Sequence, residues 1–190
     1  MKKYISFGLV FILIIYIIPL STLITKKEKK IFKGETIAVF DADTEDVFSV
    51  PLEEYVLKVL SKEMPASFEK EALKAQAVAI RTYTLKKKQT KNEKHPKATV
   101  CTDSNHCMAY LKEEINKEYR EKLESAVRET EGQVLMFENE YASTVFHAIS
   151  SGRTENSQDI WGGQVPYLVS VESTEDKNVK DYETKVTVSY

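Results

Sequence analysis

The chain has 190 residues, of which 42% are hydrophobic and 29% are charged. This balance is typical of a folded domain of ordinary size and excludes an intrinsically disordered chain. The formal net charge of -2 leaves no overall basic excess, so nucleic acid is not an expected partner.

The N-terminal residues have the pattern of a membrane anchor. Tyr4 to Thr25 carries no charged residue and, at ~1.5 Å per helical residue, is long enough to cross a hydrocarbon core of ~30 Å. A cleaved signal peptide is the alternative, but its apolar core is normally ~7–15 residues long, whereas here apolar residues continue past Pro19. We therefore predict an uncleaved anchor over residues 1–25 and a charged linker over residues 26–34. Because more lysines follow the span than precede it, the positive-inside rule alone would place the next domain inside.

Two β-forming runs and two helices are predicted next. Residues 36–40 and 46–50 flank a run of turn formers at 41–45, which indicates a hairpin. Apolar residues recur at helical spacing over 52–62 and predict a first helix. The segment 68–88 is dense in Ala, Leu, Glu, Lys and Gln, which favours a second helix.

Pro65 breaks the chain between these two helices and leaves Glu63 at the break. A proline has no amide proton and pushes the residue before it out of helical angles, so the first helix should end at Glu63. A carboxylate at such a junction can point into a cleft. The simpler alternative is that it caps the junction or forms a salt bridge there. The partial negative charge at a helix C-terminus favours a protonated acid, while the start of the next helix opposes this effect.

The second half of the chain predicts one more helix and several strands. An apolar stripe over 115–127 indicates a third helix. Strands are expected over 133–137 and 141–147, followed by a polar loop over 149–163 with little sign of regular structure. Residues 186–190 have the pattern of a further strand. Together these elements predict an α+β fold, with helices packed on a short antiparallel sheet.

One polar segment offers four side chains that can ligate a metal. They are His95, Cys101, His106 and Cys107. Tetrahedral zinc accepts two sulfur and two nitrogen ligands. A disulfide between the two cysteines is an equal alternative in an oxidising exterior. Since four protein ligands leave no open position for water, a zinc ion here would be structural.

A set of short motifs extends over nearly the whole chain outside the predicted anchor. The motifs are Glu63-Met64-Pro65, Glu71 to Ala77, Arg81-Thr82-Tyr83, Cys101 to Cys107, Ser151 to Asn156 and Pro166-Tyr167-Leu168. This combination resembles the stage II sporulation protein D family, whose domain is shared with amidase-enhancer proteins. The resemblance implies a lytic transglycosylase anchored in the membrane of an endospore-forming bacterium. Such an enzyme cuts the glycan strands of peptidoglycan during engulfment of the forespore.

The resemblance gives Glu63 a catalytic role. Hydrolysis of a glycosidic bond normally takes two carboxylates set ~5–9.5 Å apart. A lytic transglycosylase can use one, because muramic acid supplies its own 6-hydroxyl as the nucleophile. Glu63 is expected to protonate the leaving oxygen of the β-1,4 bond between N-acetylmuramic acid and N-acetylglucosamine. It would then act as the base and leave a 1,6-anhydro end.

The resemblance also places several side chains near the substrate. They are Lys74, Gln76, Arg81, Tyr83, His147, Ser151 and Arg153. A sugar site takes polar side chains together with an aromatic ring or two for stacking. The residues alone leave simpler explanations open: a solvated charged face for Lys74 and Arg81, a packed histidine at position 147, and a salt bridge between Arg153 and Glu155.

Location and partners follow from the resemblance as expectations. Because the substrate lies outside the cytoplasm, residues 35–190 are expected outside, as a domain anchored in the engulfing membrane of the mother cell. Expected partners are denuded glycan strands, the sporulation amidase that prepares them, and the membrane scaffold of the engulfment machinery. The alternative function is a non-catalytic, glycan-binding activator of a cell-wall amidase. Relatives extend further with a glycine- and histidine-rich segment, so we expect the domain to be truncated at its C-terminus.

Overall fold

The structure is a computed structural model that describes residues 32, 34–90 and 92–174, together with the isolated residues 178, 182 and 187. The predicted anchor, nearly all of the linker and the predicted strand over 186–190 lie outside the described residues, apart from the isolated positions just named. Among the described residues, no helix is both long and apolar enough to span a membrane. The chain divides into two compact units, Met1–Ala142 and Ser143–Tyr190, and the predicted domain over 35–190 includes parts of both.

Unit 1 begins with the predicted hairpin. Strand β1 spans Thr36–Phe40 and strand β2 spans Val47–Pro51, and they pair antiparallel. Alternation along β1 buries Ile37 and Val39, as expected for a strand with one face on the core. Pro51 ends β2 and precedes the first helix as its N-cap, rather than occupying the first helical position.

The helix break occurs where the sequence predicts it. Helix α2 spans Leu52–Glu63, and the next residue, Met64, has extended backbone angles of φ -133° and ψ 131°. This is the conformation that a following proline imposes. Helix α3 then spans Lys70–Lys88. It begins two residues later than predicted, because the amide of Phe68 closes a turn onto the carbonyl of Pro65 at 3.0 Å.

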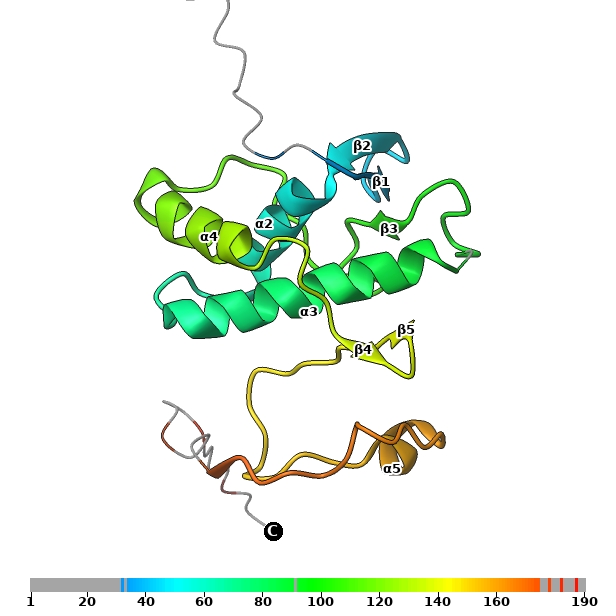
Figure 1. Ribbon diagram of the computed structural model, residues 1–190, viewed down its shortest axis with the longest axis vertical. Coiled ribbons are helices and arrows are strands. Elements are labelled where there is room, and N and C mark those ends of the chain that lie inside the picture. The colour runs from blue at the N-terminus through cyan, green and yellow to red at the C-terminus, as the bar shows by residue number, and fades with distance from the viewer. Residues whose placement is uncertain are drawn as a thin grey trace, which may run out of the picture. The chain divides into compact units, whose positions relative to one another are not determined.

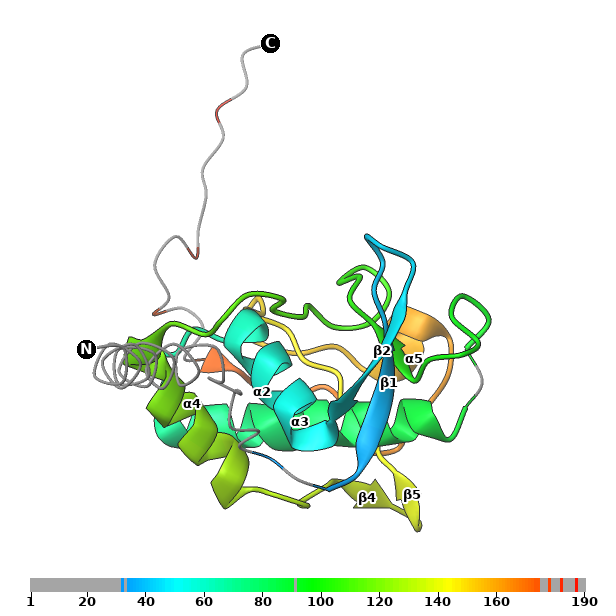
Figure 2. The same ribbon diagram turned by 90° about the horizontal axis from the view of Figure 1, so that it is seen from above.

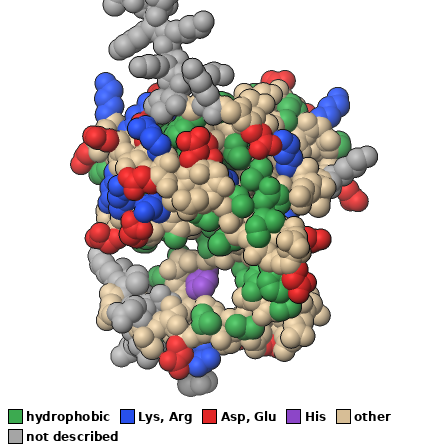
Figure 3. All heavy atoms as spheres, in the orientation of Figure 1, with side chains coloured by type: hydrophobic (Ala, Val, Ile, Leu, Met, Phe, Trp, Pro, Cys, Tyr) green, Lys and Arg blue, Asp and Glu red, His purple; other side chains and the backbone are tan. Residues whose placement is uncertain are grey.

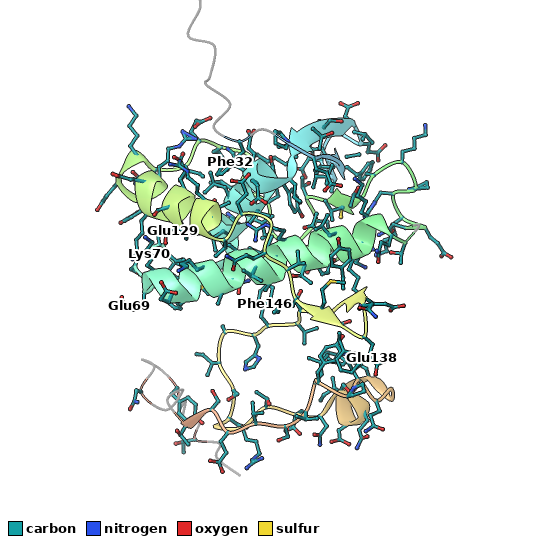
Figure 4. All side chains as sticks on the ribbon, in the orientation of Figure 1. Phe32, Glu69, Lys70, Glu129, Glu138 and Phe146 are labelled. Carbon is teal, nitrogen blue, oxygen red and sulfur yellow. The ribbon has the colours of Figure 1, made fainter. Side chains whose placement is uncertain are left out.

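Three helices form the body of unit 1. Helix α4 spans Lys117–Glu129, with Asn116 as an N-cap whose side chain accepts the Glu118 amide. Helices α2, α3 and α4 pack against one another in both views (Figures 1 and 2). Lys70 at the start of α3 forms an ion pair with Glu129 at the end of α4, as Figure 4 shows. Blue and red side chains gather over this end of the unit (Figure 3).

The three-stranded sheet of unit 1 is mixed, which corrects the prediction of an antiparallel one. Strand β3, Val100–Cys101, pairs with β1 in parallel, with Val39 opposite Val100, so the strand order is β2-β1-β3. A parallel neighbour requires a crossover connection, and α2 and α3 lie between β2 and β3 in the sequence. The α+β class is confirmed by four helices and two small sheets in the described part of the chain.

The last strands of unit 1 are shorter than predicted. Strands β4, Met136–Phe137, and β5, Glu140–Tyr141, form a hairpin with a two-residue turn. Both turn residues, Glu138 and Asn139, have positive φ, 49° and 67°. The rest of the predicted strand over 133–137 bonds to α3 side chains instead. The Gln133 carbonyl accepts from Arg81, and the Leu135 amide donates to Thr82. These bonds occupy groups that a longer ladder would need.

Unit 2 contains the predicted polar loop and one short helix inside it. Helix α5 spans Ser157–Trp161 and ends at Gly162, whose φ of 73° is the left-handed conformation common at helix ends. A single β-bridge joins Arg153 to Glu172. The Thr154 hydroxyl accepts a hydrogen bond from the Val171 amide and donates one to the Val171 carbonyl, which holds the two sides of this loop together.

Candidate functional site

The four predicted metal ligands converge in unit 1. His95 lies in the turn after α3, Cys101 ends β3, and His106 and Cys107 follow in the next loop. Their ligand atoms all lie within 4.8 Å of one another. The Cys101 sulfur is 3.4 Å from His106 Nδ1, and the Cys107 sulfur is 3.6 Å from His95 Nε2 and 3.7 Å from His106 Nδ1.

These distances fit a tetrahedral metal site. Sulfur and nitrogen ligands at ~2.3 and ~2.1 Å from a zinc ion, at the tetrahedral angle, are about 3.6 Å apart. The second ring nitrogen of His95 lies 3.0 Å from the Ala98 carbonyl. A hydrogen bond there fixes the tautomer that turns the Nε2 lone pair toward the cluster, as metal-bound histidines require. The cluster can therefore hold a metal such as zinc.

Neither thiol is used in a disulfide, so both are available as metal ligands. Both cysteines are free in the structure, so the disulfide alternative is not the form seen here. Burial and a hydrogen bond with Cys107 raise the pKa of the Cys101 thiol to about 11. Burial, together with the nearby Lys94, lowers the pKa of His106. A bound cation would deprotonate the thiols outright.

Tyr83 lies against the metal cluster. Burial and contact with the Cys107 thiol, including a hydrogen bond, raise its pKa well above the ordinary value. Lys87 lies 5.5 Å from the centre of its ring. The structure thus places Tyr83 beside Cys107, a candidate metal ligand, while its predicted contact with substrate stays a prediction.

Glu63 is the last residue of α2 and is half-buried. Its Oε1 accepts the backbone N–H of Ala109 at 2.6 Å. Among the described residues it forms no ion pair, so the salt-bridge alternative is not what the structure shows. Its neighbour Lys62 and the adjacent Tyr110 line a polar hollow of about 380 Å³. Glu63 itself does not line this hollow, and its carboxylate is oriented by one backbone donor, the Ala109 amide.

The α3 candidates are placed in different surroundings. Lys74 forms ion pairs with Glu71 at 2.9 Å and with Glu129 at 3.8 Å. Arg81 is fully buried, and its guanidinium donates two hydrogen bonds to Glu53, at 2.8 and 2.6 Å. Gln76 is buried, and its Nε2 has no hydrogen-bond partner among the described residues. These positions give Lys74 and Arg81 roles in packing α3 and leave a ligand role for either of them an untested prediction.

The three remaining candidates lie together in unit 2. His147, Ser151 and Arg153 line one hollow of about 600 Å³. Arg153 pairs with Glu172 at 3.1 Å, which corrects the alternative of a salt bridge with Glu155. The hollow also contains Trp161, 61% exposed on α5, which sequence reasoning did not select. Trp161 could have been selected from the sequence because it is the single tryptophan of the chain and lies in a polar loop.

Comparison with known proteins assigns the chain to a family. The family model described as Stage II sporulation protein (SpoIID) matches residues 41–137, about half of the chain. Glu63, the α3 candidates and the metal cluster lie inside this range, and the unit 2 hollow lies beyond it.

Individual proteins similar to this chain support the same family assignment. Stage II sporulation protein D of Bacillus subtilis (strain 168) is 35% identical over 161 residues, which cover 80% of this chain and 47% of that protein. The protein of that name from Bacillus amyloliquefaciens is 35% identical over 156 residues, 77% of this chain and 45% of the relative. The amidase enhancer of B. subtilis is 31% identical over 121 residues, 64% of this chain and 15% of the enhancer. The chain spans about half the length of the two sporulation proteins, and it belongs to the stage II sporulation protein D family.

Proposed function

We propose that this chain is a membrane-anchored lytic transglycosylase that acts on denuded peptidoglycan strands during engulfment in sporulation. The placement of Glu63 carries the proposal. Its carboxylate ends a helix at a proline break, accepts one backbone N–H at 2.6 Å, and has no cationic partner among the described residues. A general acid must be free to deliver a proton to its substrate, and an ion pair would hinder this transfer.

The reaction needs one carboxyl group. Protonated Glu63 gives its proton to the oxygen that links N-acetylmuramic acid C1 to N-acetylglucosamine C4, and the C1–O bond breaks. The resulting carboxylate then takes the proton from the 6-hydroxyl of the same muramic acid, whose oxygen bonds to C1. The product has a 1,6-anhydro end, no water is consumed, and Glu63 is protonated again. Ala109 holds Oε1, which leaves Oε2 for the proton.

Substrate contacts are proposed in each unit separately. In unit 1, Gln76 has a buried amide nitrogen without a described partner, and donation of a hydrogen bond to a sugar oxygen would satisfy it. In unit 2, His147, Ser151 and Arg153 would bind glycan in their shared hollow, with Trp161 as a stacking platform. Lys74, Arg81 and Tyr83 would act mainly by holding the helices and the metal cluster in place.

The metal centre is proposed to hold structural zinc. All four ligands come from the protein, so no coordination position remains for a reacting water. His95 and Cys101 would fix the end of α3 to β3, and His106 and Cys107 would fix the loop that follows. Zinc would stabilise the folded chain rather than take part in bond cleavage.

One experiment separates an enzyme from an amidase activator. The full chain, Glu63→Gln and the control Glu69→Gln are incubated with denuded glycan strands, and 1,6-anhydro products are measured by mass spectrometry. Glu69 is an exposed N-cap residue of α3 without a side-chain capping bond (Figure 4). We expect Glu63→Gln to lose at least ~100-fold in rate, in line with loss of a general acid, and the control to match the parent.

A parent rate in Glu63→Gln would remove the enzymatic assignment. The similarity to an amidase enhancer then favours the second function, a glycan-binding activator of a cell-wall amidase. That function predicts that the chain raises the rate of a purified sporulation amidase, and that Glu63→Gln raises it equally. The same assay with amidase added therefore distinguishes the two proposals.

Location follows from the proposed substrate. We propose residues 1–25 as the anchor, with the units after it outside the cytoplasm and near the amidase and membrane scaffold of the engulfment machinery. Protease added to intact cells should digest the chain beyond the anchor. Protection of the chain under these conditions would contradict the proposed orientation.

A further inference from the structure

The metal cluster and Glu63 are joined by a very short piece of chain. Cys107 is two residues before Ala109, and two residues span at most ~7 Å. The Ala109 amide is the group that binds Glu63 Oε1 at 2.6 Å. A ligand of the cluster and the donor that orients the carboxylate therefore belong to one local backbone segment.

This segment has little secondary structure to hold it. No helix or strand lies between Cys101 at the end of β3 and Lys117 at the start of α4. In Figure 2 it runs back along α2 on its way to α4. Before Ala109, a turn bonds the amides of His106 and Cys107 to the carbonyl of Asp103, at 3.1 and 2.8 Å. After Cys107, Met108 is buried in the core and Tyr110 stacks on Tyr55, with ring centres 5.6 Å apart. The Ala109 amide is therefore held by this packing and by whatever fixes Cys107.

Contacts within the cluster are weak unless a metal is bound. They are sulfur–nitrogen contacts of 3.4 to 3.7 Å and a 3.3 Å bond from the Cys101 amide to the Cys107 sulfur. Thiols are weak hydrogen-bond donors. Four metal–ligand bonds would instead tie the loop to β3 and to the turn after α3, which carries His95. Metal binding would therefore add a fixed point, at Cys107, to the loop from which Ala109 reaches Glu63.

We propose that the metal centre positions Glu63, with the Cys107–Ala109 segment as the link and the Ala109 amide as the positioning group. The proposal rests on the proposed function only in taking Glu63 as the reacting carboxyl group. Coupling between two sites is reciprocal in free energy. If metal binding favours the bond between Ala109 and Glu63, then removing the Glu63 carboxylate must weaken metal binding by the same factor.

The first test is the zinc affinity of the full chain in mild detergent, measured by competition with a chromogenic chelator. Glu63→Ala removes the acceptor, and Glu69→Ala is the matched control. We expect Glu63→Ala to bind zinc about 5-fold more weakly or worse, which is the lower end of typical coupling between sites, and Glu69→Ala to equal the parent. Equal zinc affinity of Glu63→Ala and the parent would overturn the proposal. No substrate is present, so the result is independent of whether the chain cleaves glycan.

The second test follows the Ala109 amide itself. Alanine labelled with ¹⁵N reports hydrogen exchange at Ala109, assigned by loss of its signal in Ala109→Ser, and at Ala126, which is buried in α4. In the zinc-loaded parent we expect Ala109 to exchange at least about tenfold more slowly than in zinc-loaded Glu63→Ala, with no difference at Ala126. Chelation should remove this protection from Ala109. Protection that persists at Ala109 after zinc removal would show that the loop needs no metal and would refute the proposed link.

Discussion

The ion pair between Glu53 and Arg81 gives the sharpest stability prediction. The Arg81 side chain is 0% exposed and that of Glu53 is 9% exposed, and two hydrogen bonds of 2.8 and 2.6 Å join them. A third guanidinium hydrogen bond, 3.0 Å long, reaches the Gln133 carbonyl. Arg81→Met therefore leaves a buried carboxylate without its cation and a carbonyl without its donor.

The expected loss of unfolding free energy is large because the ion pair is buried. Removing one partner of a buried pair typically costs about 3–5 kcal/mol, against a total of about 5–15 kcal/mol for a folded domain. Replacing both partners by apolar residues is often nearly neutral, because no uncompensated charge remains. The double variant Glu53→Leu with Arg81→Met should therefore be more stable than Arg81→Met alone.

Urea unfolding of the full chain, followed by circular dichroism, measures both effects. A loss below about 1 kcal/mol in Arg81→Met would refute the argument, since that is the value of an exposed pair. Equal stability of the single and double variants would also refute it. Lys74→Met is the control on the same helix, where the ion pairs are exposed and little change is expected.

Four further predictions test other parts of unit 1. Asn116→Ala should cost about 1 kcal/mol in the same urea assay, because the N-cap of α4 loses its hydrogen bond. Tyr83→Phe should weaken zinc binding about 10–100-fold in a chelator competition, the usual effect of removing a partner of a metal ligand, and unchanged affinity would exclude this role. A hydrogen bond from Lys112 lowers the pKa of Asp41 below its ordinary 3.8. The stabilisation is present above that pH and is lost as pH falls through the lowered pKa. Asp41→Asn should therefore be less stable than the parent at pH 6, and the difference in stability should shrink as the pH falls below 3.8. Gln76→Leu should leave urea stability unchanged or higher, because an unpaired buried amide is removed, while glycan binding measured by calorimetry should fall.

Local rules were sufficient to predict the helix break. Pro65 acts on its own neighbours, so the end of α2 at Glu63 and the extended Met64 could be derived from the sequence alone. The hairpin of β1 and β2 could also be predicted from the sequence, because turn formers separate two β-forming runs. The cluster that can hold a metal was predictable because its four residues lie within one short segment.

The features that the sequence did not reveal depend on distant partners. The parallel pairing of Val39 with Val100 joins residues on either side of two helices. The predicted strand over 133–137 is cut short because Arg81 and Thr82, more than fifty positions earlier, take up its backbone groups. Periodicity cannot detect such competition, since a strand pattern is the same whether its partner is another strand or a helix side chain.

The two faces of α3 explain why the predicted substrate residues separate in the structure. Lys74 and Arg81 are seven positions apart and share a face, and that face packs on α4, where they meet Glu129 and the Val127 carbonyl. Gln76 and Tyr83 share the other face by the same spacing, and Tyr83 lies at the metal cluster. Of these four side chains, Gln76 alone keeps a buried polar atom without a partner in the described residues. Such a group is unfavourable unless something binds it. Gln76 is therefore the α3 candidate with an unmet hydrogen-bonding group, and ligand binding by any of the four side chains stays a prediction.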